Sequence, residues 1–97
     1  MMKFYRDDDN APRAQAEGEL ALLAAYLESD VQDDKEAGIE LLQFLERKKG
    51  ERVGNAYSIR FEEKEVLIEE LHGDQSGSVN RNIFFQAVEA WIVFVGD

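Results

Sequence analysis

The stretch that organises the fold is Asn80 to Val95, which reads NRNIFFQAVEAWIVFV. From Ile83 onward only two of its residues are polar, so a helix here would be apolar on almost every side. The apolar residues that share one face at helical spacing are Phe84, Ala87, Val88, Trp91 and Val95. We therefore predict a closing helix that the rest of the chain covers on most sides, with Asn80 as its N-cap.

A helix is also predicted in the first third of the chain. Pro12 is the only proline, and it suits a first helical turn, where its missing N–H has no helical partner to lose. The residues from Arg13 to Glu28 continue with leucine and alanine side chains on one face. Gly18 weakens the first turns of this helix by about 1 kcal/mol relative to alanine.

Another helix is predicted from Lys35 to Lys49, where apolar residues again recur at helical spacing. Asp33 or Asp34 is available as its N-cap. The segment Arg47-Lys48-Lys49 places cations in the last turn, where the helix dipole favours them. Gly50 is the expected residue just beyond the helix end.

The two segments Tyr57–Phe61 and Glu65–Leu71 predict an antiparallel hairpin. Apolar and polar residues alternate in the first segment, which is typical of a strand with one buried face. Glu62-Glu63-Lys64 forms the turn between them. Leu67 breaks the alternation of the second strand, which indicates either a bulge or contacts on both faces.

These elements predict an α+β fold in a single domain that spans residues 1–97. A small antiparallel sheet packs against three helices. The hairpin alone would be marginal, so we expect the N-terminal strand Met2–Arg6 or a helix to support it. Residues 73–78 are predicted to be a loop by composition, and no helix or strand is predicted for residues 51–55.

The composition offers little for catalysis. The chain has no cysteine, and its only histidine, His72, has no obvious partner for acid–base chemistry or metal binding. It also lacks a glycine-rich phosphate loop. We therefore predict no enzyme activity, no catalytic or metal-binding residues and no cofactor. The first residues contain no apolar leader, and no segment is suited to span a membrane, so we expect a cytoplasmic protein.

The charge balance is strongly acidic, with 21 acidic and 11 basic residues and a formal net charge of −10. Such a field repels nucleic acid and anionic membranes and attracts basic partners. The acids gather along the hairpin and between the first two helices. The candidate partner-binding residues are Asp30, Asp33, Asp34, Glu62, Glu63, Glu65, Glu69, Glu70 and Asp74.

The placement of these acidic side chains has two interpretations. Charged side chains on a strand protect a sheet edge from pairing with other chains. The same side chains could instead steer a basic protein partner onto the surface.

The part of the chain from Gly54 to Val95 resembles bacterial immunity proteins of contact-dependent growth inhibition and related polymorphic toxin systems. The resemblance lies in the strand end Ile68-Glu69-Glu70-Leu71, the acidic loop that follows it, and the helix aromatics Phe84, Trp91 and Phe94. It implies a small cytoplasmic antidote that binds one cognate toxin domain and blocks its active site. Many such toxins are nucleases with basic substrate surfaces, which would give the acid clusters a purpose.

Two other classes of function are also compatible with the sequence. An adaptor or scaffold subunit would bind a different protein, and its acidity would serve only solubility. A small metal-dependent enzyme would use the acid clusters as ligands, but adjacent carboxylates in a flexible segment usually stay solvated.

Overall fold

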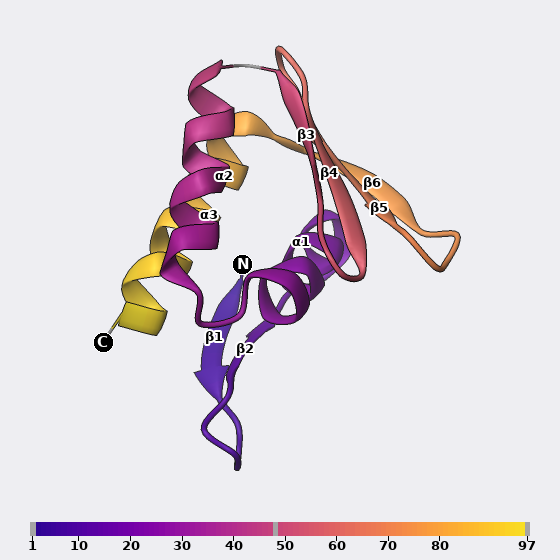
Figure 1. The fold of residues 1–97 in the computed structure, drawn as a ribbon. Coiled ribbons are helices and arrows are strands. Elements are labelled where there is room, and N and C mark those ends of the chain that lie inside the picture. The colour runs from indigo at the N-terminus through magenta and orange to yellow at the C-terminus, as the bar shows by residue number, and fades with distance from the viewer. Residues whose placement is uncertain (1, 48, 97) are drawn as a thin grey trace.

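A computed structural model describes residues 2–47 and 49–96 of the chain (Figure 1). Its N-terminal half holds the hairpin β1 (Lys3–Arg6) and β2 (Pro12–Gln15), a 3₁₀ turn η1 (Gly18–Leu20), α1 (Ala21–Tyr26), its π-helical continuation η2 (Leu27–Val31), and α2 (Lys35–Arg47). Its C-terminal half holds β3 (Gly50–Val53), β4 (Tyr57–Phe61), β5 (Glu65–Glu70), β6 (Ser76–Asn80) and α3 (Arg81–Gly96). The predicted α+β class is confirmed.

The main sheet has four antiparallel strands in the order β3-β4-β5-β6. Its central hairpin is the predicted one, with Ile59 opposite Ile68 and Phe61 opposite Val66. The register runs without a bulge past Leu67, which is half-buried. The N-terminal strand does not join this sheet, because β1 pairs with β2 in a separate two-stranded sheet. Support for the hairpin comes instead from β3 and β6.

The core lies between one face of this sheet and the helices (Figure 1). Strand alternation sends Ile59, Phe61, Val66, Ile68 and Val79 to that face, where all five are buried. The closing helix contributes three fully buried side chains: Phe84, Val88 and Trp91. The ring of Phe61 stacks on Phe44 at 5.2 Å and meets Phe84 edge-on at 5.7 Å, which joins the sheet to α2 and α3.

α2 and α3 run antiparallel and touch at a glycine. A Cβ atom on Gly38 would lie 2.6 Å from Cγ1 of Ile92, so only glycine permits this approach. At one end of the pair, Arg81 donates a hydrogen bond to the carbonyl oxygen of Leu45. At the other end, Gly96 lies beside Lys35. The N-terminus of α3 is thereby fixed against the C-terminus of α2.

The first predicted helix begins later than expected. Pro12 and Ala14 are buried strand residues that alternate with exposed Arg13 and Gln15, so the segment pairs with β1 instead of coiling. Gly18 follows with a φ of +63°, a conformation that interrupts a right-handed helix. The helical stretch therefore starts only at Gly18 and runs through η1, α1 and η2 to Val31.

The second predicted helix is confirmed from Lys35 to Arg47. Lys48 lies outside the described residues, and Lys49 is not helical. Gly50 does not cap the helix but opens β3, with a φ of +128° and with Phe44 only 2.9 Å from where a Cβ would stand. A side chain at this position would collide with that ring.

Two strands were not predicted. β3 occupies most of the segment 51–55, for which no element was expected, and β6 begins inside the predicted loop 73–78. The closing helix is confirmed, and Asn80 caps it through a 2.7 Å hydrogen bond from the Asn82 N–H to its side-chain oxygen. Its coverage on most sides is not confirmed, since Ile83, Phe85 and Val93 are exposed.

Candidate functional site

No helix formed by residues 2–47 or 49–96 lies over one face of the four-stranded sheet (Figure 1). The three described helices lie on the opposite face, against the core. Strand alternation places polar and small side chains on the uncovered side, which we call the open face. The open face consists of Glu51, Val53, Ser58, Arg60, Glu65, Leu67, Glu69, Ser76, Ser78 and Asn80.

The open face and the β4–β5 turn at its end are acidic. Glu62 and Glu63 are exposed in the turn, and Glu65 and Glu69 are exposed on β5. None of these four carboxylates forms an ion pair with any residue in 2–47 or 49–96. The only cation of the open face, Arg60, lies 3.8 Å from Glu51. Lys64 is exposed in the same turn but forms no ion pair with a described residue, so these four acids are unpaired and outnumber the cations around them.

The backbone of this turn is held in place although its side chains are exposed. The Glu62 N–H donates to the carbonyl oxygen of Glu65 at 2.9 Å. Arg81 donates through Nη1 to the carbonyl oxygen of Glu62 at 3.0 Å. Because Arg81 also binds Leu45, the acidic turn is tied to the end of α2.

The other two hairpin acids lie at the far end of β5. Glu70 is half-buried, and its Oε1 accepts the Gln75 N–H at 3.1 Å, which closes the β5–β6 turn. Asp74 is exposed in that turn. A strand of this length spans roughly 20 Å, so Asp74 is well separated from Glu62. Glu70 has a structural partner within the chain, whereas Asp74 has none among the described side chains.

The acidic residues between α1 and α2 also differ in whether they have a hydrogen-bond partner within the chain. Asp30 accepts backbone N–H groups from Ala56 at 3.1 Å and from Tyr57 at 3.0 Å, so it ties η2 to the β3–β4 turn. Asp34 caps α2, since its Oδ1 accepts the Glu36 N–H at 3.0 Å. Asp33 is exposed beside the β1–β2 turn. Asp30 and Asp34 are therefore engaged in backbone hydrogen bonds within the chain, and none of the three acids is a residue of the open face.

The open face carries a groove that the sequence did not predict. A hollow of about 340 Å³ is lined by Leu67, Glu69, Ser76, Gly77 and Ser78, and we call it the β5–β6 groove. It exists because β6 carries short side chains opposite the long ones of β5. The sequence signal for this groove was Leu67, the apolar residue that interrupts the alternation of polar and apolar residues in β5.

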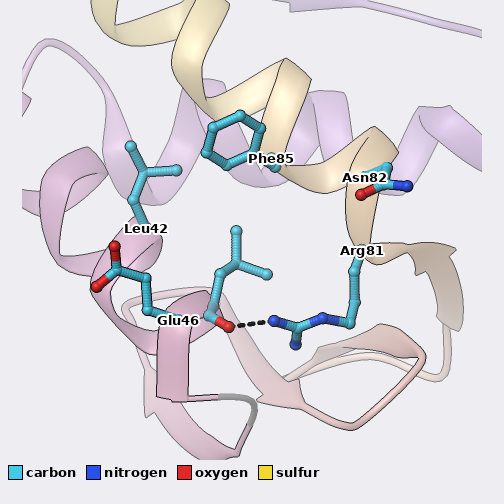
Figure 2. Close-up of a pocket in the computed structure, with 6 residues that line it drawn as sticks. Leu42, Glu46, Arg81, Asn82 and Phe85 are labelled. Atoms are coloured by element: carbon cyan, nitrogen blue, oxygen red, sulfur yellow. Dashed lines mark hydrogen bonds between the residues drawn. The ribbon is translucent and has the colours of Figure 1, made fainter.

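A second hollow, of about 400 Å³, lies between α2 and α3 (Figure 2). Leu42, Leu45 and Phe85 give it an apolar lining, while Glu46, Arg81 and Asn82 stand around it. The side chain of Phe85 is 42% exposed. This hollow offers an apolar contact surface with two charged side chains, Glu46 and Arg81, beside it.

The group with the most perturbed pKa lies in the core and away from both hollows. Burial raises the pKa of the Tyr26 hydroxyl to about 12. Arg52 donates to this hydroxyl at 3.2 Å and also binds Glu40 at 2.9 Å. The chain of three side chains links α1, β3 and α2. It stabilises the fold and faces no cavity.

The described residues contain no group of three histidine, aspartate or glutamate side chains placed to hold a metal ion. None of the helices they form is both long and apolar enough to cross a membrane. Comparison of the chain with protein-family models, curated proteins and solved structures yields no match. The features that bear on the function are therefore the open face and the sequence resemblance of residues 54–95.

Proposed function

We propose that this chain is a cytoplasmic antidote that binds and neutralises one cognate toxin domain. The toxin is of the nuclease type, with a basic surface that normally holds nucleic acid. The antidote presents its open face and the β4–β5 turn to that surface and covers the active site. It performs no catalysis and needs no cofactor.

The observation that carries this proposal is the unpaired charge of Glu65 and Glu69 on the open face and of Glu62 and Glu63 in the adjoining β4–β5 turn. Fixed charges of one sign raise the association rate with a partner of the opposite sign. A surface that holds phosphates must itself be basic, so it is complementary to this face. The sequence resemblance to immunity proteins supports the same partner class.

The experiment is co-expression with the toxin encoded beside the gene, together with association kinetics at several salt concentrations. The wild-type chain should protect cells, and its association rate should fall steeply as salt rises. A variant with Glu62, Glu63, Glu65 and Glu69 changed to lysine should associate much more slowly and lose protection.

The matched control changes four exposed acids that are neither on the open face nor among the candidate partner-binding residues to lysine: Asp8, Asp9, Glu19 and Glu89. It alters the formal net charge by the same amount, so it measures the effect of total charge alone. Protection by both variants with an association rate insensitive to salt would contradict the acidic-face mechanism. Failure of the wild-type chain to protect would contradict the antidote function.

The second candidate is an adaptor or scaffold subunit that binds another protein without a toxin partner. The hollow between α2 and α3 favours it, because Phe85 and Leu42 offer an apolar contact there (Figure 2). Phe85→Ser should abolish the binding of a partner that occupies that hollow, and this binding should change little with salt concentration. Ile83→Ser is the matched control, since Ile83 is 43% exposed on the same helix but lies outside the hollow.

A further inference from the structure

We propose that the β5–β6 groove is a socket for one arginine side chain of the protein partner. The proposal rests on the proposed function and names the side chain that this site recognises. The groove lies on the open face, at the edge of the sheet formed by β6.

The strand register gives the groove one apolar part and one anionic part. Leu67 lies opposite Ser78, and Glu69 lies opposite Ser76. Two residues along a strand separate Leu67 from Glu69 by roughly 7 Å on the same face. The short serine side chains on β6 leave space beside both of them, and Gly77 between the serines adds no bulk.

Arginine fits this pair of surfaces better than other side chains. Its methylene stem can cover Leu67 while its charged head reaches Glu69. The planar guanidinium carries five N–H donors and can bind a carboxylate with two of them at once. The hydroxyl groups of Ser76 and Ser78 are further acceptors within the same groove. The ammonium of lysine has fewer donors and cannot bind in this planar way.

The sheet already holds one arginine on this face. Arg60 lies directly across from Leu67 on the β4 side, and its guanidinium is 3.8 Å from Glu51. An incoming arginine would occupy the equivalent place on the β6 side of Leu67. Glu69, unlike Glu51, has no ion pair with any described residue, so its charge is available to a partner.

The test is an NMR titration of the full chain with the peptide Ac-Ala-Arg-Ala-NH₂. We expect millimolar binding, with the largest amide shifts at Leu67, Glu69 and residues 76–78. The same peptide with citrulline keeps the shape of arginine without its charge, and it should bind about tenfold more weakly or worse, because the charge-assisted bonds are lost. The lysine peptide should also bind more weakly than the arginine peptide.

Glu69→Gln should weaken arginine binding about tenfold, while Asp74→Asn should leave it within about twofold. The two substitutions change the net charge equally, and Asp74 lies outside the groove. Equal effects of both substitutions, equal binding of arginine and citrulline peptides, or shifts centred on Glu62 and Glu63 would each overturn the socket.

The outcome is separable from that of the antidote function because the probe is a peptide and not a toxin. If the peptide binds in the groove as described but the chain protects no cell, the antidote function fails and the arginine site stands. If the chain protects cells while Glu69→Gln matches Asp74→Asn in both peptide binding and toxin dissociation, the socket fails and the function stands.

Discussion

The indole N–H of Trp91 donates a 2.7 Å hydrogen bond to the backbone carbonyl oxygen of Gln32. Trp91 is fully buried in α3, and Gln32 lies in the turn just before α2 with a φ of +53°. The same indole meets the ring of Phe4 edge-on at 5.0 Å. The Trp91 side chain thus joins the closing helix to β1 and to the turn before α2.

Replacing Trp91 with alanine should lower the free energy of unfolding by about 3–5 kcal/mol, because it removes a large buried ring and leaves a cavity. Chemical denaturation gives this value directly. Gln86→Ala is the control, since Gln86 is exposed on the same helix and should change stability by less than about 0.5 kcal/mol. A loss below about 1 kcal/mol for Trp91→Ala would mean that the closing helix is peripheral to the core.

Asp30 should prove to be a structural residue and not a binding residue. Asp30→Ala leaves the N–H groups of Ala56 and Tyr57 without their acceptor, so we expect a loss of about 1–3 kcal/mol in unfolding free energy. Asp33→Ala should be nearly silent in the same denaturation experiment, because Asp33 is exposed. Equal unfolding free energies for the two variants would mean that the hydrogen bonds between Asp30 and the β3–β4 turn do not contribute measurably to stability.

Gly54 supplies an independent measurement of that tie. A Cβ atom at this position would overlap Oδ2 of Asp30. Gly54→Ala should therefore destabilise the wild-type chain more than it destabilises the Asp30→Ala variant, where the space is free. Additive effects of the two substitutions would contradict the contact.

The sequence was informative where side chains alone specify an element. The closing helix, its Asn80 cap and the hairpin Tyr57–Phe61 with Glu65–Glu70 were predicted because their apolar spacing reflects direct burial. β3 and β6 were missed because they are edge strands. Val79 is the only buried side chain that β6 supplies, and β3 supplies none, so their position depends on backbone pairing with β4 and β5.

The candidate site was predicted by charge and not by geometry. A count of acids cannot tell a solvent-exposed carboxylate from one that accepts backbone hydrogen bonds. Asp30, Asp34 and Glu70 all bind backbone N–H groups, whereas Glu62 and Glu69 remain exposed. The β5–β6 groove depends on cross-strand register between Leu67 and Ser78, which the sequence does not specify once β6 is taken for a loop.

Tyr26 should make the fold sensitive to alkali. Its pKa is raised to about 12, above its ordinary value of about 10, so the folded state favours the neutral hydroxyl. The stabilisation is fully present below pH 10 and is lost as the pH rises through about 12. We expect the difference in unfolding free energy between wild type and Tyr26→Phe to shrink by about 2–3 kcal/mol over this range. Urea denaturation at a series of pH values measures it, and a constant difference would contradict the burial of the ionisable hydroxyl.

The acidic residues of the open face and the β4–β5 turn should reduce the stability of the fold. Glu62, Glu63, Glu65 and Glu69 repel one another and the other acids of a chain with a net charge of −10. Raising the salt concentration from about 0.01 M to about 0.5 M shortens the range of this repulsion, so the melting temperature of the wild-type chain should rise. The variant with these four residues changed to lysine should gain less from salt and should be at least as stable as wild type at low salt. A variant that melts lower than wild type at low salt would mean that these carboxylates have stabilising partners, and they would then be poorly placed to steer a basic protein.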